Sequence, residues 1–84
     1  MPQYRAFVKD CLNLGGLVKS NVNCLSFQIV RDLLDKATST FVLEYIDPNI
    51  DIGDVLGLYD MYGTILYIGV VEEIDIQSNQ ITCT

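Results

Sequence analysis

Polar and apolar residues alternate along much of this chain with the two-residue period of a half-buried β-strand. In Leu25–Val30, apolar side chains alternate with Ser26 and Gln28, so one face of the strand is apolar and the other polar. Residues 38–45 alternate in the same way and are rich in β-branched and aromatic types, which favour strands. We expect these two strands to pair antiparallel. Residues 4–9 predict a further strand near the N-terminus.

The second half of the chain predicts a hairpin. Apolar runs on either side of Asp60-Met61-Tyr62-Gly63 meet at a turn in which Asp supplies a side-chain acceptor and Gly tolerates a positive φ. The pattern then continues as strand over residues 72–77, bends at residues 78–79 and returns through residues 80–83.

Residues 13–23 contain Gly15-Gly16 and predict a loop, although Leu17-Val18 could form a short strand. Residues 31–37 are rich in helix formers but are too few for more than one short helical turn. The whole pattern predicts an all-β fold, a small barrel or compact sandwich of about six short antiparallel strands. Gly57 and Gly69 lie inside expected strands, where glycine marks a bend, a bulge or a close approach.

The inward faces of these strands define an expected core, because alternate residues of a strand point to the same side of the sheet. In residues 38–45 the inward set also includes Tyr45. The expected core consists of Leu25, Phe27, Ile29, Phe41, Leu43, Leu56, Leu58, Ile65, Tyr67 and Ile74.

The length of 84 residues predicts a single β domain over residues 1–84. Half of the residues are hydrophobic and 19% are charged, so the chain has enough apolar material to fold. Because the chain ends inside its last expected strand, we expect it to be the N-terminal domain of a longer polypeptide.

The formal net charge of −6, with five scattered basic residues, gives no electrostatic footprint for phosphate backbones, so we expect no nucleic-acid partner. The longest apolar stretch, Ile65–Val71, is far shorter than a membrane span, and the N-terminus lacks the order of a signal peptide. We therefore expect synthesis in the cytoplasm without membrane insertion.

The residue inventory predicts that the chain is not an enzyme and carries neither metal nor cofactor. It has no histidine, and Cys11, Cys24 and Cys83 lack zinc-ligand spacing, so we expect three unpaired thiols. The acidic segment starting at Asp47 departs from a calcium loop because Ile52 stands where that loop needs glycine. Glu72, Glu73 and Asp75 are interpreted as a solvated strand face, because neighbouring strand residues point to opposite sides.

Asp60, Met61 and Tyr62 are the candidate contact residues. The turn is expected to expose Tyr62, and an exposed aromatic residue on a loop favours a protein contact. Tyr59 and Tyr67 are expected to pack in the core or at its rim.

Four segments together resemble the N-terminal β domain of tail proteins from phages and prophages of Gram-positive bacteria. They are a strand at residues 26–31, the segment 34–41 ending in Ala37-Thr38-Ser39-Thr40-Phe41, the run Gly53-Asp54 to Tyr59-Asp60, and Tyr67-Ile68-Gly69-Val70-Val71. The resemblance covers roughly residues 24–84, and it transfers no functional residue. It implies a structural module of the baseplate or hub that packs against copies of itself and other tail proteins, and hence a place in the virion tail. The acidic surface would then steer the domain toward basic patches on its neighbours.

Two other functions stay open at this point. One is a β module that binds carbohydrate or a host surface, and the other is a small-barrel adaptor of cellular origin. Both use surface residues and no active site.

Overall fold

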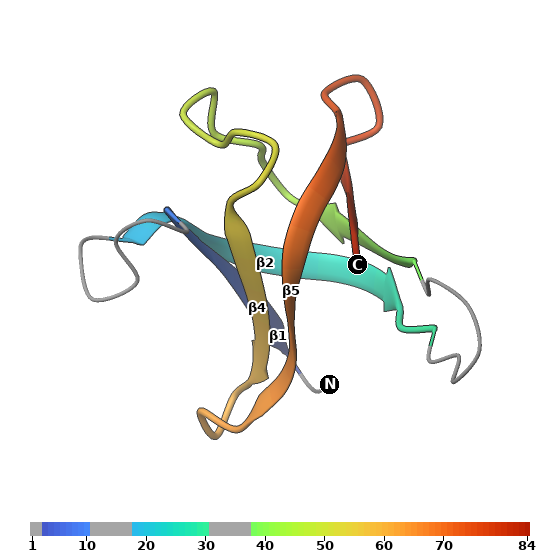
Figure 1. The fold of residues 1–84 in the computed structure, drawn as a ribbon. Coiled ribbons are helices and arrows are strands. Elements are labelled where there is room, and N and C mark those ends of the chain that lie inside the picture. The colour runs from blue at the N-terminus through green and yellow to red at the C-terminus, as the bar shows by residue number, and fades with distance from the viewer. Residues whose placement is uncertain (1–2, 11–17, 31–37) are drawn as a thin grey trace.

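The computed structural model describes residues 3–10, 18–30 and 38–84, which form a closed barrel of antiparallel strands (Figure 1). The order around the barrel is β1-β2-β3-β6-β5-β4, and β4 pairs with β1 to close it. The all-β prediction is confirmed, and of the two architectures predicted, a small barrel and a compact sandwich, the structure is a barrel. The expected helical turn at residues 31–37 lies outside the described residues. The strands are β1 (Tyr4–Lys9), β2 (Val18–Gln28), β3 (Ser39–Leu43), β4 (Val55–Asp60), β5 (Ile65–Asp75) and β6 (Gln80–Cys83).

The two long strands, β2 and β5, hold the barrel together because each pairs with two neighbours. The first half of β2 pairs with β1 and its second half with β3, as expected for residues 25–30 and 38–45. In the same way β5 pairs first with β4 and then with β6. The loop predicted for residues 13–23 is wrong over its second part, because β2 already begins at Val18; residues 13–17 lie outside the described residues.

Each long strand contains two bulges that interrupt the alternation of its side chains. In β2 the extra residues are Lys19 and Leu25, and in β5 they are Leu66 and Glu72. A bulge places two residues opposite one, so the side chains beyond it change face relative to a regular strand.

These bulges account for two errors in the expected core. Leu25 is itself a bulged residue and is 66% exposed, whereas the preceding Cys24 points inward. Ile65 precedes the bulge at Leu66, pairs with Tyr59 on the outer face and is 53% exposed. Tyr45 is also exposed, because β3 ends at Leu43 and the alternation ends with it.

Most of the other expected core residues lie in the barrel interior. Phe41, Leu43, Leu56 and Leu58 are fully buried, and the remaining four are partly buried against them. A loop over residues 44–54 covers one end of the barrel and buries two isoleucines there. The buried residues that the sequence pattern did not single out are Ala6, Val8, Cys24, Ile46, Ile50, Val71, Ile81 and Cys83.

Both strand-interior glycines lie beneath aromatic rings. A Cβ at Gly57 would collide with the ring of Phe7 on the outside of the barrel. A Cβ at Gly69 would collide with Tyr67, whose ring packs on Phe41 with centroids 5.1 Å apart. The close approach expected at these glycines is therefore made by side chains.

The barrel is built from two similar halves, β1–β2–β3 and β4–β5–β6. Each half is an antiparallel meander whose long central strand has bulges at its second and eighth residues. The pairing registers relate the halves by an approximate twofold axis that maps β1 onto β4, β2 onto β5 and β3 onto β6. In two of the cross-strand pairs, Phe7 with Gly57 and Phe41 with Ile81, the two paired residues are each other's counterparts. The paired strand residues of one half therefore have counterparts at the same register positions in the other.

Candidate functional site

The turn predicted at residues 60–63 joins β4 to β5 and is held by its aspartate. One carboxylate oxygen of Asp60 accepts hydrogen bonds from the backbone N–H groups of Tyr62 and Thr64, both at 2.9 Å. Gly63 has a φ of 83°, which fits the residue tolerant of positive φ that the sequence pattern required. Met61 and Tyr62 are 60% and 85% exposed, so both side chains project from the molecule.

An apolar surface adjoins this turn on the outside of β4 and β5. We call it the sheet face. Across the strands, Val55 pairs with Val70, Gly57 with Ile68, and Tyr59 with Ile65, so all of these side chains point outward together. Ile65, Ile68 and Val70 are 53%, 59% and 44% exposed. The members of the sheet face are Val55, Tyr59, Ile65, Ile68, Val70 and the Phe7 ring that covers Gly57.

At four of the five sheet-face positions on β4 and β5, the other half of the barrel has a polar or charged residue. The exception is Ile65, whose counterpart is the apolar Val18. By the twofold relation, Asn21 and Asn23 on β2 are the counterparts of Ile68 and Val70 on β5. On β1, Arg5 and Lys9 are in the same way the counterparts of Val55 and Tyr59. Because the same outward sites accept amides and cations in one half, the apolar side chains of the other half need a reason outside the barrel itself.

Two cations border the sheet face on β1. The guanidinium of Arg5 donates to the side-chain oxygens of Asn21 and Asn23 at 3.0 and 2.9 Å, which fixes its position. The ammonium of Lys9 lies 5.8 Å from the centre of the Phe7 ring, within range of a cation–π interaction. A shallow groove of about 320 Å³ runs beside these residues to Gly63 and Ile65, and it connects the sheet face to the turn.

The opposite side of the barrel has a different character. Where β3, β6 and the second half of β5 meet, the outward residues are polar: Thr40 pairs with Thr82, which in turn pairs with Glu73. Glu73 and Asp75 are both exposed, as expected, whereas Glu72, the bulged residue, is partly buried and accepts a hydrogen bond from the Thr84 hydroxyl at 3.1 Å. This part of the barrel exterior is therefore more polar than the sheet face.

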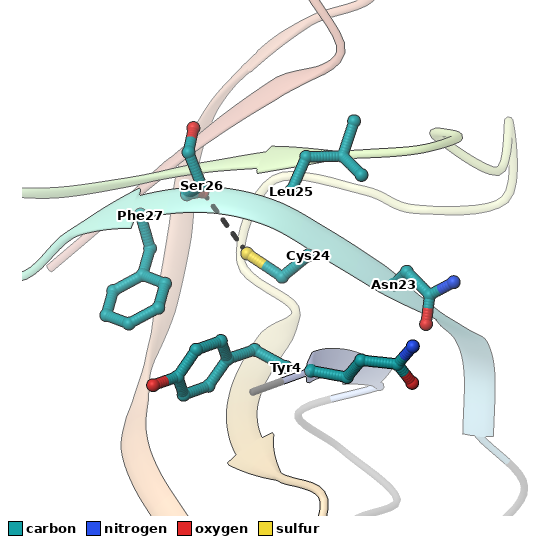
Figure 2. Close-up of a pocket in the computed structure, with 7 residues that line it drawn as sticks. Tyr4, Asn23, Cys24, Leu25, Ser26 and Phe27 are labelled. Carbon is teal, nitrogen blue, oxygen red and sulfur yellow. Dashed lines mark hydrogen bonds between the residues drawn. The ribbon is translucent and has the colours of Figure 1, made fainter. Parts of the chain in front are cut away.

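A second, larger groove of about 520 Å³ lies where β2 passes the start of β1 (Figure 2). Figure 2 shows the rings of Tyr4 and Phe27 side by side, and Leu25 directed away from them; the ring centroids are 5.0 Å apart. The Cys24 thiol donates to the Ser26 carbonyl oxygen at 3.2 Å. No charged side chain lines this groove, and Gln3, Tyr4, Asn23 and Ser26 contribute polar groups to it.

An ion pair fastens the loop over residues 44–54 to β2. The bulge at Lys19 turns its ammonium toward Asp54, which is 4% exposed, at 2.8 Å, and toward the exposed Asp51 at 3.5 Å. The Asp54 carboxylate also accepts the backbone N–H of Asp51 at 2.8 Å. The hydrogen bond to Asp54 raises the pKa of Lys19 above its usual value, which keeps the ammonium charged. This arrangement is structural, since the carboxylate is already satisfied.

The two described cysteines, Cys24 and Cys83, are buried and unpaired. Burial raises the pKa of Cys24 to about 11. Burial, with the nearby Glu72 carboxylate, raises the pKa of Cys83 to about 12. Both thiols are therefore protonated at neutral pH, and neither has the thiolate character that a nucleophile or metal ligand needs.

Within residues 3–10, 18–30 and 38–84, no three acidic or cysteine side chains come close enough together to hold a metal ion. The same residues contain no helix that is long and apolar enough to cross a membrane.

No protein-family model matches this chain, and neither a curated protein nor a solved structure does.

Sequence reasoning placed the turn correctly but missed the sheet face beside it. Asp60, Met61 and Tyr62 are gathered at one tip, whereas Ile65 and Tyr59 had been interpreted as core or rim residues. One available signal was the unbroken apolar run of Ile65–Val71: a strand with only one buried face should alternate, so continuous apolarity indicates that both faces are covered.

Proposed function

We propose that this chain is a non-enzymatic assembly module that acts through protein–protein contacts made by the sheet face and the adjoining turn. The observation that carries the proposal is the difference between the two halves: equivalent outward sites hold Asn21 and Asn23 in one half, but Ile68 and Val70 in the other. Exposed apolar residues that the fold does not need, bordered by charged groups, are typical of interaction surfaces.

The setting suggested by the sequence resemblance is the tail of a phage or prophage, in a baseplate or hub. There the domain would pack against copies of itself and against other tail proteins. The turn that contains the exposed Tyr62 directly joins β4 to β5 and lies at the lower end of these two strands in Figure 1. An aromatic anchor of this kind contributes about 2 kcal/mol or more to binding when the interface buries it.

The test is to co-express the chain with the products of the adjacent genes and to measure complex formation at low and high salt. We expect a complex that Ile68→Glu abolishes and Tyr62→Ala weakens by about 2 kcal/mol. Salt should weaken it, because Arg5 and Lys9 border the contact. Gln28→Glu, on the polar side of the barrel, is the matched control and should bind like the wild type. Equal binding by the wild type and Ile68→Glu would contradict the proposal.

A second candidate is carbohydrate binding, which the neighbouring aromatic rings of Phe7 and Tyr59 favour, with centroids 6.1 Å apart beside Asn21. Against it, the Tyr59 hydroxyl already donates to the Asn21 side chain at 3.0 Å, and Arg5 donates to the same oxygen. The polar atoms that would recognise sugar hydroxyls are thus engaged with one another. Binding on a glycan array that is lost in Tyr59→Ala would support this alternative.

A further inference from the structure

The end of the barrel covered by the loop over residues 44–54 forms a second distinctive surface, which we call the loop end. Figure 1 shows this loop and the turn between β5 and β6 at the same end of the molecule, away from the turn between β4 and β5. Hydrogen bonds tie both segments to the barrel: Leu43 N–H donates to Asn79 O, and Gly53 N–H to Val71 O, each at 2.8 Å. The loop end is therefore a defined surface.

The loop end combines exposed apolar side chains with carboxylates. Tyr45, Ile52 and Ile76 are 54%, 70% and 71% exposed. Each of them adjoins an acidic residue in the sequence, and the Asp51 side chain is 78% exposed despite its contact with Lys19. The apolar members of the loop end are Tyr45, Ile52 and Ile76, and its carboxylates are Asp47, Asp51 and Asp75.

The loop end and the sheet face complement each other in chemistry. Both expose aliphatic and aromatic side chains, but cations border the sheet face and carboxylates border the loop end. The basic residues among the described ones are Arg5, Lys9 and Lys19, and Lys19 is held by Asp54. Arg5 and Lys9 place positive charge beside the sheet face, on a chain with a net charge of −6, and the Arg5 guanidinium also donates to Asn21 and Asn23.

We propose that the partner of the sheet face is the loop end of a second copy of this chain. The inference rests on the proposed docking function and names its partner. Apolar side chains of the two surfaces would exclude water from each other, while the carboxylates of one copy meet Arg5 and Lys9 of the next. A contact of two sheet faces would instead bring the cations of both copies together, which is unfavourable.

The contact is head-to-tail, because it joins two different surfaces of the same chain. Each copy keeps one free surface after pairing, so association continues until the chain of copies closes into a ring or grows as a filament. A closed dimer would need both contacts to form at once between the same two copies, so an association of the wild type that stops at a dimer would contradict the open arrangement.

The experiment is sedimentation velocity with variants that block one surface each. Ile68→Glu places a carboxylate on the sheet face, and Ile52→Lys places a cation on the loop end; both positions are exposed, so folding should be retained and is checked by circular dichroism. Gln28→Glu and Gln28→Lys are matched controls on the polar side of the barrel. The wild type and both controls should form species larger than a dimer as concentration rises, and less so at high salt.

We expect each blocked variant alone to be a monomer, and their equimolar mixture to form a dimer and nothing larger. The intact loop end of Ile68→Glu can dock on the intact sheet face of Ile52→Lys, but neither copy can extend the chain. A mixture that stays monomeric while the wild type associates would overturn the head-to-tail contact. A wild type that is monomeric at every concentration yet binds an adjacent gene product through Ile68 would overturn this inference and leave the proposed function intact.

Discussion

Phe41 has the largest fully buried side chain among the described residues. It is fully buried, lies at the twofold pair with Ile81 and packs its ring against Tyr67. We expect Phe41→Ala to reduce the free energy of unfolding by roughly 3–5 kcal/mol, through lost transfer energy and the cavity left behind. A chain of this size has little stability to lose. Urea denaturation followed by circular dichroism measures the loss, and a midpoint equal to that of the wild type would contradict the packing described.

The buried thiols predict a loss of stability at alkaline pH. A thiol in the unfolded chain has a pKa near 9.0, whereas the folded pKa is about 11 for Cys24 and about 12 for Cys83. Their contribution to stability is therefore complete below pH 9 and is lost as pH rises toward 11–12, because the unfolded state releases its protons first. The free energy of unfolding should fall over that window.

The matched measurement uses the double variant Cys24→Ala/Cys83→Ala. It should be less stable at neutral pH but should lose less stability between pH 9 and 11 than the wild type does. Equal slopes in the two proteins would show that other groups cause the alkaline loss.

The sequence pattern identified buried residues correctly on regular stretches of strand but not at bulges. Phe41, Leu43, Leu56 and Leu58 lie on regular stretches, and alternation placed all four correctly. Ala6 is absent from the expected core because it is not a large apolar residue, so a pattern built on leucines and aromatics does not mark it.

At the scale of elements, the loop over residues 44–54 depends on the buried carboxylate of Asp54. It accepts hydrogen bonds from Lys19 and from the backbone of Asp51, and the loop buries Ile46 and Ile50 over the barrel end. We expect Asp54→Ala to destabilise the fold by roughly 1.5–3 kcal/mol, because the hydrogen bonds to a charged group are lost.

Asp51→Asn is the matched control for this loop. Its carboxylate is exposed and lies 3.5 Å from Lys19, so removing the charge should change stability by less than about 1 kcal/mol. Thermal denaturation of both variants gives the comparison. Similar losses in the two would mean that the ion pair network, and not the buried carboxylate, holds the loop.

Bulges also explain which elements were predictable. The strands and the turn at Asp60 follow from local chemistry, since alternation and turn residues act over a few positions. A bulge depends on pairing with a strand distant in sequence: Leu25 is extra only because Cys24 and Ser26 face neighbouring residues of β3. The outward placement of Leu25 and Ile65 could therefore not be derived from their own segments.

At the scale of the whole molecule, the two halves share an architecture but not an amino-acid pattern. Ser20 and Cys24 occupy the places of Tyr67 and Val71, and such replacements leave no repeat for a sequence to display. Comparison of equivalent positions in the two halves nonetheless distinguishes the residues that fill the barrel interior from those that differ on its outer surface. Inward sites are filled in both halves, whereas outward sites that hold Ile68 and Val70 on β5 hold Asn21 and Asn23 on β2.

The claim that the sheet face docks a protein is tested most directly by following backbone amide signals in ¹H–¹⁵N correlation spectra during dilution of the wild-type chain. Specific contact moves the signals of residues at the interface and leaves the others in place. We predict concentration-dependent shifts in residues 65–70 and in the loops over residues 44–54 and 76–79, with Thr40 and Thr82 unchanged on the polar side. Shifts centred on β3 and β6, with residues 65–70 unchanged, would contradict the account.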